Sequence, residues 1–553
     1  MGIPSYFRHL CQSYPHVIQP WENQTVHNLY LDSNSIIYDS MRLIDYNGND
    51  NDFEERLIQK VCETIDSYLI QIQPTEEVFI CFDGVAPVAK LEQQRDRRFK
   101  SSFMNDVARQ LGDSKPCWNQ TAITPGTEFM NKLNHRMNDY YSRVDLPVLL
   151  GIPTKQIRFS GSDQPGEGEH KLFAYIRDTP RKYKETSVIY GLDADLIVLS
   201  LNHLSYGNLL LYRETPAFVQ NFSDLEPNAS YVLNIKKLRL AILSEMTGMT
   251  GEPNELARLR MYDYILLTFL LGNDFLPHFP GICLRTRGMD ILMGVYRNLF
   301  GRGTLMNSQT LCVERDGLQI HWRTFRKFVE ELAKREHSDW IEEYRIRAKW
   351  EKMPVKMDTT DKDGNPIRVI VKDGMDYEQV KDAGLAQLLN LPVKQRELEY
   401  YIRPEMVGWQ KRYYENVVGI RKNQIKSCCI NYLSGIEWVL KYYSRGCPDW
   451  RWCYHYPYPP LLEDLRVYTP GFQQEMIQYK KPEPVAPIVQ LMYVLPKSAH
   501  DLLPELYRKR LTTHPYKTWY PTEVEFIWAF CRYFWECHAL LPDIDIKMLE
   551  QLV

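Results

Sequence analysis

The segment Ser187-Val-Ile-Tyr-Gly-Leu-Asp-Ala-Asp-Leu-Ile-Val198 sets two aspartates, Asp193 and Asp195, between two apolar runs. A second segment, Pro165-Gly-Glu-Gly-Glu-His-Lys171, repeats this spacing with two glutamates beside another apolar run. The apolar neighbours predict burial, and buried carboxylates repel one another and lose hydration unless a partner neutralises them. Two pairs of carboxylates, each at positions i and i+2, favour the binding of hard divalent cations that the carboxylates share as ligands. The two segments therefore predict a metal-dependent enzyme that acts on phosphates.

The first 290 residues alternate between strand-like and helix-like patterns. The strand candidates are Val26–Asp32, Val78–Asp83, Ser187–Leu192 and Asn208–Tyr212. This alternation predicts an α/β fold with a mainly parallel sheet and helices on both faces. Ligand sites in such sheets form at the carboxyl ends of the strands. Asp32, Asp83 and Asp193 each end a strand candidate, so three separate segments should deliver carboxylates to one edge.

Composition excludes several classes of protein. The chain has 553 residues, of which 44% are hydrophobic and 25% charged, as in soluble globular proteins with two or more domains. Twelve cysteines without a CxxC pair or a signal peptide predict reduced thiols and an intracellular protein. No apolar stretch is long enough to span a membrane. The net charge of -3 does not by itself indicate nucleic-acid binding, so local basic patches must carry that argument.

Three regions are expected along the chain. Residues 1–330 are expected to form the α/β region with the metal site, 331–395 a connecting segment, and 396–553 a mostly helical, aromatic-rich second region. Within the connection, the turn residues of Asp361-Lys-Asp-Gly-Asn-Pro366 precede the β-prone run Ile367–Val371. This pattern predicts an inserted hairpin.

A basic helix is expected directly after Asp83. Its residues Lys90, Gln94, Arg97 and Arg98 fall at i, i+4, i+7 and i+8, so one helical face presents all four. Arginine forks and a lysine point charge on one face suit a terminal phosphate. The alternative is a solvated surface helix with intrahelical ion pairs, such as one between residues 92 and 95. Proximity to the predicted metal site favours the functional interpretation.

Seven carboxylates from five segments form the candidate metal site. They are Asp32, Asp83, Glu167, Glu169, Asp193, Asp195 and Asp274. Taken singly, Asp32 or Asp83 is also suited to cap a helix, and Asp274 to occupy a turn. Two divalent ions about 4 Å apart explain the whole set better, because each ion needs several oxygen ligands. One ion would activate water, and both would stabilise charge on the phosphoryl group.

Ordered motifs along nearly the whole chain resemble one family, the 5′→3′ exoribonucleases of the Xrn/Rat type. The motifs in the first region are Met1-Gly-Ile-Pro-Ser-Tyr-Phe-Arg8, Leu31-Asp-Ser-Asn34, Phe82-Asp-Gly-Val-Ala-Pro87, Gln93-Gln-Arg-Asp-Arg-Arg-Phe99, Ile123-Thr-Pro-Gly-Thr-Glu-Phe-Met130, Pro165–Lys171, Tyr190–Leu199, Arg213-Glu214 and Gly272-Asn-Asp-Phe-Leu-Pro-His278. Those in the second region are Gly408-Trp-Gln-Lys-Arg-Tyr-Tyr414, Trp438-Val-Leu-Lys-Tyr-Tyr-Ser-Arg-Gly446, Gln490-Leu-Met-Tyr-Val-Leu-Pro496 and Leu540-Leu-Pro542.

The resemblance implies a PIN-like nuclease core with two magnesium or manganese ions. It further implies processive degradation of single-stranded RNA that bears a 5′ monophosphate, with release of nucleoside monophosphates. Carried over by motif, the seven carboxylates become metal ligands, and Lys90, Gln94, Arg97 and Arg98 become the 5′-phosphate pocket.

Two aromatic residues are expected to hold the first base of the RNA. Tyr38 stands where cellular members of the family often have a stacking histidine, and a tyrosine ring can also stack a base. The opposing residue is Trp450 or Trp452, of which the motif favours Trp450. The alternative for either tryptophan is a place in the core.

Other expectations concern extent, assembly and rivals. The chain resembles a minimal catalytic core without the long C-terminal extension of the cytoplasmic branch of the family. We expect it to be a monomer. A cytoplasmic location is favoured over a nuclear one. One rival is a structure-specific DNA flap nuclease, which shares the acidic core. The Phe-Leu-Pro-His sequence after Asp274 matches the exoribonuclease pattern instead. The other rival is an inactive RNA-binding scaffold, which is disfavoured because no acidic residue of the motif set is missing.

Overall fold

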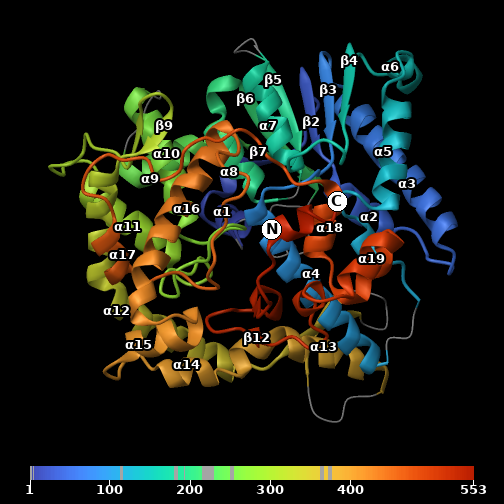
Figure 1. The fold of residues 1–553 in the computed structure, drawn as a ribbon. Coiled ribbons are helices and arrows are strands. Elements are labelled where there is room, and N and C mark those ends of the chain that lie inside the picture. Colours follow the sequence, from blue (N-terminus) through green and yellow to red (C-terminus); the bar gives the residue numbers. More distant parts are fainter. Residues whose placement is uncertain are drawn as a thin grey trace.

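A seven-stranded sheet organises the N-terminal part of the chain (Figure 1). The computed structural model describes residues 3, 5–112, 116–179, 185–191, 193–214, 229–248, 254–360, 366–371 and 377–553. The strands are β1 (Ile18–Pro20), β2 (Asn28–Asp32), β3 (Glu77–Cys81), β4 (Gln156–Ser160), β5 (Thr186–Tyr190), β6 (Asn208–Glu214) and β7 (Ser230–Asn234). They lie in the order β1-β7-β6-β5-β2-β3-β4; β6, β5, β2, β3 and β4 are parallel, and β7 is antiparallel to both of its neighbours, β6 and β1. The predicted α/β class with a mainly parallel sheet is confirmed.

All four strand candidates coincide with strands of this sheet, namely β2, β3, β5 and β6. Several strand ends differ from expectation by one or two residues, two of them next to the candidate site. Strand β3 ends at Cys81, two residues before Asp83, and β5 ends at Tyr190. Leu192, the expected end of β5, lies outside the described residues. Strand β4 was not expected from the sequence, because it lies at the sheet edge and none of its residues is fully buried.

Hydrophobic cores cover both faces of the sheet. Leu29 and Leu31 of β2 belong to one core, while Tyr30 between them belongs to the other. This alternation follows from the two-residue period of a strand. The first core includes α3 (Asp50–Ile72) and α5 (Glu128–Tyr141), and the second includes α7 (Gly168–Asp178), α8 (Asp195–Asn202), α9 (Ile235–Thr247) and α10 (Glu255–Phe269). Burial on both faces explains why the central strands are almost continuously apolar.

Helix α4 (Val88–Gln110) joins the sheet to segments from the far end of the chain (Figure 1). It contacts α13 (Tyr377–Lys394), α18 (Pro487–Val494) and β13 (His538–Ala539). Arg95 donates hydrogen bonds to the carbonyls of Trp519 at 3.0 Å and Pro542 at 2.8 Å. Arg95 is only 2% exposed, so this flank of α4 is part of the interior. The alternative of a solvated surface helix is therefore wrong.

The second region is built mainly from helices and irregular segments. Its helices include α14 (Glu397–Ile402), α15 (Trp409–Tyr413), α16 (Ile425–Arg445) and α17 (Leu462–Tyr468), and the long helix α12 (Trp322–Lys352) precedes it. The expected hairpin is confirmed by the antiparallel pair β10 (Lys356–Thr360) and β11 (Pro366–Ile370). Its turn, residues 361–365, lies outside the described residues. The division of the chain at residues 330 and 395 stays a prediction.

Two general features complete the fold. All twelve cysteines are free thiols. Among the described residues, no helix combines the length and the apolar composition that a membrane crossing requires.

Candidate active site

The carboxyl ends of three neighbouring strands deliver aspartates to one edge of the sheet. Asp32 is the last residue of β2, Asp83 lies two residues after β3, and Asp193 lies three residues after β5. Strand β2 pairs in parallel with both β3 and β5, so the carboxyl ends of the three strands lie side by side. Asp32 is buried and Asp193 is exposed. The sequence-based expectation of a shared edge is confirmed for these three residues.

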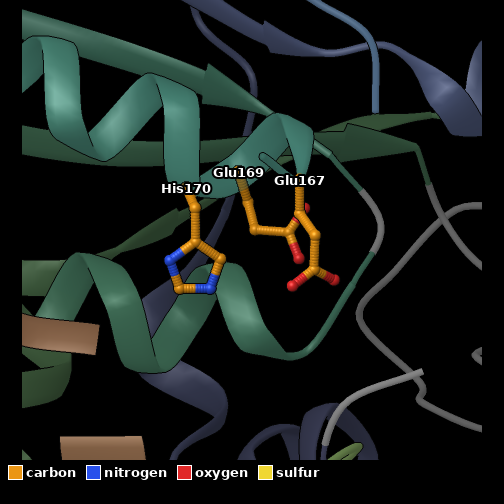
Figure 2. Close-up of side chains that lie close together, drawn as sticks. All are labelled: Glu167, Glu169 and His170. Carbon is orange, nitrogen blue, oxygen red and sulfur yellow. The ribbon is translucent and has the colours of Figure 1, made fainter. Parts of the chain in front are cut away.

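The start of helix α7 adds two glutamates to this edge. Glu167 is the N-cap residue of α7, and Glu169 lies in its first turn. Figure 2 shows their carboxylates and the ring of His170 projecting from the same turn. One ligand atom from each of these three residues lies within 4.8 Å of the others. The spacing that the sequence suggested thus corresponds to a single helix start.

Gly168 allows this turn to approach the strands closely. A Cβ atom at this position would lie 2.5 Å from Asp32 Oδ1 and 3.3 Å from Asp83 Oδ1. The Gly168 N–H donates a hydrogen bond to Asp83 Oδ1 at 2.7 Å. Asn34 orients the same carboxylate, because its side-chain amide donates to Asp83 Oδ2 at 2.5 Å. The glycine between the two glutamates is therefore required by space.

Asp32, Asp83 and Glu169 form a group of oxygen ligands. One carboxylate oxygen from each lies within 4.8 Å of the other two. Asp32 Oδ1 is buried without a hydrogen-bond partner. Burial raises the pKa values of Asp32 and Glu169 well above their usual range, and neighbouring carboxylates raise them further. Clustered oxygen donors with unused capacity fit a hard divalent cation such as magnesium or manganese.

Asp195 and Asp274 lie beside this group. Asp195 opens helix α8, and Asp274 lies in the loop that follows α10. Burial, followed by the charge of Asp274, raises the pKa of Asp195 to about 7. Asp195 Oδ1 is buried without a hydrogen-bond partner. Because the charge of Asp274 affects the pKa of Asp195, these two expected residues lie in the same site.

Lys90 of helix α4 connects the acidic site with the basic helix. Its Nζ lies 2.6 Å from Glu167 Oε2 and 2.6 Å from Asp274 Oδ2. Burial opposes ionisation of Asp274, but the Lys90 ammonium outweighs it and lowers the pKa of that carboxyl. The sequence predicted Lys90 only as a phosphate ligand. Its two ion pairs with the acidic set were not foreseen, because spacing along the chain does not show which segment faces a helix.

The remaining phosphate candidates follow Lys90 along α4. Arg98 donates a hydrogen bond to Thr124 Oγ1 at 2.6 Å, and its second terminal nitrogen is buried without a partner. Burial, followed by the charge of Arg97, lowers the pKa of Arg98 to about 10, while Tyr38 opposes this effect. Tyr38 therefore lies close to Arg98. Gln94 is buried, and its Oε1 atom has no hydrogen-bond partner.

The two tryptophan candidates have different surroundings. Trp452 stacks on Trp438 with ring centroids 5.2 Å apart and packs against the larger core. Trp450 is half-buried and belongs to none of the hydrophobic clusters of described residues. Its carbonyl accepts a hydrogen bond from the N–H of Val88 at 3.0 Å, where α4 begins. These positions favour Trp450 for stacking and a core role for Trp452.

Helix α16 contributes contacts that sequence reasoning missed. The hydroxyl of Tyr442 donates to Glu167 Oε1 at 2.8 Å, and its ring stacks on His170 with centroids 3.6 Å apart. Tyr443 makes a side-chain hydrogen bond with Asp195. Both tyrosines lie in the Trp438–Gly446 motif. That motif was the available signal, but an adjacent pair of tyrosines does not indicate which carboxylates it meets.

Comparisons with known proteins agree with this arrangement. A profile described as the XRN 5′-3′ exonuclease N-terminus matches residues 1–215, and one described as the Xrn1 helical domain matches residues 257–553. The protein named 5′-3′ exoribonuclease 1 is 27% identical in Saccharomyces cerevisiae and in Homo sapiens, over 99% of this chain in each case and over 43% and 34% of those proteins. The protein named 5′-3′ exoribonuclease 2 of Arabidopsis thaliana is 27% identical over 99% of this chain and 66% of its own length.

The chain spans between 34% and 66% of the length of these relatives. A solved structure titled the catalytic core of Rad2 in complex with DNA substrate matches 53% of this chain and 68% of its own, at 13% identity and a TM-score of 0.29. A score this low supports no conclusion about fold or function. The two profile matches together cover most of the sequence, and the chain belongs to the XRN 5′-3′ exonuclease family.

Proposed function

We propose that the chain is a processive 5′→3′ exoribonuclease that hydrolyses single-stranded RNA with a 5′ monophosphate to nucleoside 5′-monophosphates. Family membership and the names of the relatives support the direction and the substrate class. One observation supports the end preference: the carboxylate cluster meets the basic helix α4 through the ion pairs of Lys90. A phosphate-binding face placed next to a hydrolytic site makes the site depend on the RNA end.

The carboxylates are suited to two magnesium or manganese ions. Asp32, Asp83 and Glu169 supply one group of oxygen atoms, and Asp195 carries a further buried oxygen without a partner. When bound, such ions lower the pKa of water and stabilise negative charge on the phosphoryl group. Tyr442 holds Glu167 in place through its hydroxyl, and Gly168 leaves room for the strand aspartates. The structural residues thereby fix the ligand set before the substrate arrives.

The basic helix positions the substrate in this proposal. Lys90, Gln94, Arg97 and Arg98 bind the terminal phosphate and determine how far the RNA advances. Tyr38 and Trp450 stack the first base, which contributes about 1–3 kcal/mol without sequence preference. The shortened RNA then moves forward by one nucleotide. A pocket sized for one phosphate rejects capped and triphosphate ends because of their bulk.

An end-dependence assay tests the proposal. The protein is incubated with RNAs that carry 5′-monophosphate, 5′-triphosphate or 5′-hydroxyl ends, and with a DNA flap substrate, and the products are identified. Decay of the monophosphate RNA alone, to nucleoside 5′-monophosphates, is expected. Equal decay of all three RNAs would refute the phosphate pocket, and cleavage restricted to the flap DNA would favour the DNA nuclease.

Arg98→Ala should reduce the preference for 5′-monophosphate RNA over 5′-hydroxyl RNA by about tenfold or more, because one charge-assisted phosphate contact is lost. The ratio of kcat/KM for the two RNAs measures this preference. Arg109→Ala is the matched control, since Arg109 is exposed near the other end of the same helix. An unchanged ratio for Arg98→Ala would remove this residue from the pocket.

Assembly and location complete the proposal. A monomer acting in the cytoplasm remains our expectation, as does the division of the chain into regions at residues 330 and 395.

A further inference from the structure

A cavity of about 830 Å³ lies against one side of helix α4. Ala89, Gln93 and Arg97 of α4 line it, together with the loop that follows α10 and parts of residues 454–458 and 530–543. We call it the rear cavity. Its volume lies within the range of small-ligand sites, about 300–1,000 Å³. No role has been assigned to it so far.

The rear cavity and the phosphate face occupy adjacent sides of the same helix. Residues of a helix are spaced by about 100° around its axis. Gln93 therefore points about 100° away from Gln94, and only Gln93 lines the cavity. Arg97 lies between the two faces, and it lines the cavity while Lys90 and Arg98 do not. Asp274 also borders the cavity, so the cavity adjoins the acidic site.

The cavity wall has unused hydrogen-bonding capacity. Each of Gln93, Arg95, Asn273 and His278 carries a buried polar atom without a hydrogen-bond partner. These atoms include both donors and acceptors. Burial lowers the pKa of His278 to about 4, so its ring is neutral at pH 7. Buried polar atoms are seldom left unpaired, so these four side chains have hydrogen-bonding capacity for a ligand once they turn toward the cavity.

Aromatic and cationic groups complete the wall. Tyr454, Tyr456 and Trp535 line the cavity and offer ring faces for stacking. Arg97 makes no hydrogen bond or ion pair with any other described residue, so its guanidinium is available to a phosphate at the boundary with the acidic site. The cavity is also lined by carboxylates, most of which have partners in the protein: Glu92 accepts from Tyr493, Asp96 pairs with Lys100, Asp274 with Lys90 and Glu536 with Arg285. With these charges paired, the aromatic rings suit a nucleobase and the Arg97 guanidinium suits its phosphate.

We propose that the rear cavity receives the nucleoside 5′-monophosphate after cleavage, so that the product leaves along the far side of α4 while the RNA stays bound. This inference rests on the proposed exoribonuclease activity. It gives a physical route for repeated cleavage without release of the RNA, because product and substrate use different sides of one helix. Arg97 is the group that both sides share.

Equilibrium binding of AMP and UMP tests the proposal. The Asp195→Asn protein is first saturated with 5′-monophosphorylated RNA in the absence of divalent metal, so that the RNA fills the phosphate pocket without being cleaved. Equilibrium dialysis with radiolabelled AMP or UMP then measures any additional site. One further nucleotide per chain is expected, and its absence would overturn the proposal.

Matched variants locate this additional site. Gln93→Leu should weaken AMP binding about tenfold, because one polar partner of the base is removed. Trp535→Leu, at a partly exposed position, should weaken it similarly by removing a stacking face. Arg109→Ala, at an exposed position near the other end of α4, should leave it unchanged. Binding that persists unaltered in both cavity variants would place the nucleotide elsewhere and overturn the assignment.

Failure of the two proposals can be told apart. If the wild-type protein leaves 5′-monophosphate RNA intact, the proposed function fails and the cavity inference fails with it. If the RNA decays to nucleoside monophosphates but no additional AMP binds, only the rear cavity loses its role.

Discussion

Two groups of buried carboxylates in this molecule have opposite surroundings. In the second region, both oxygens of Glu399 on α14 accept hydrogen bonds from the protein, from Arg347 and Arg396 and from the N–H of Phe530. At the sheet edge, Asp32 and Asp195 each keep a buried oxygen without a partner.

The pKa shifts follow this difference. Burial opposes ionisation of Glu399, but Arg347 outweighs it and lowers its pKa. Burial and neighbouring carboxylates raise the pKa of Asp32. A carboxylate saturated by protein donors stabilises the fold, whereas one left with unused oxygens and like charges around it is kept for a ligand.

Asp195→Asn should separate activity from stability. We expect cleavage to fall on the order of 10³-fold, because a proposed ligand of the ions that stabilise charge on the phosphoryl group is lost. The melting temperature should stay the same or rise, since one buried like charge is removed. RNA decay and thermal unfolding are measured on the same preparation.

Asp178→Asn is the control for this experiment, because Asp178 is exposed at the end of α7. An Asp195→Asn protein with normal cleavage would contradict the assignment of the acidic site.

Glu399→Gln should have the opposite effect, lowering stability without a direct effect on cleavage. It removes the ion-pair partner of Arg347 and one of the two partners of Arg396, which keeps Glu351, and breaking a buried ion pair costs about 3–5 kcal/mol. The melting temperature should therefore fall sharply, and activity should be lost only as the protein unfolds. Activity assayed well below the new melting temperature distinguishes the two effects. Loss of cleavage in a fully folded Glu399→Gln protein would contradict a purely structural role for Glu399.

Gly168→Ala should disturb the acidic site through space alone. The added methyl group would stand 2.5 Å from Asp32 Oδ1, and overpacking of this kind costs about 1–3 kcal/mol. The affinity for magnesium, measured by calorimetry, should fall together with the melting temperature. Gly294→Ala within α11 (Gly288–Phe300) is the control, because no atom lies within 4 Å of its added Cβ and alanine favours a helix. Equal magnesium affinity in both variants would refute the tight approach.

Glu336 is a third kind of buried carboxylate, and we expect the smallest effect from its substitution. It accepts hydrogen bonds from the backbone N–H groups of Leu462 and Glu463, and burial raises its pKa to about 8. The folded state thus binds a proton more tightly than the unfolded state. The resulting stability is present below the ordinary pKa of 4.5 and is lost as the pH rises to about 8.

The test compares wild type with Glu336→Gln between pH 5 and 8. The stability difference between them should change with pH by at most about 1.4 kcal/mol per unit, because a single group titrates. Melting temperatures at matched ionic strength measure it. A pH-independent difference would mean that Glu336 does not titrate in this range.

Sequence reasoning reached the acidic residues because their signals are local. A strand pattern followed by aspartate places Asp32 at a sheet edge, and the Glu-Gly-Glu spacing places two carboxylates on one helix start. It missed the anchoring of α4 because the acceptors are backbone carbonyls, of Trp519 and Pro542, which have no side-chain signature. It also missed the contact of Tyr442 with Glu167, because pairing between distant segments depends on packing that periodicity does not reveal.

The anchors of α4 have a consequence for the making of the protein. The helix that carries the phosphate candidates is fixed by carbonyls more than 400 positions further along the chain. A ribosome has synthesised the strands and the acidic residues long before it reaches Pro542. The growing chain therefore cannot complete the side of α4 that carries the phosphate candidates until residues 519–542 have emerged from the ribosome.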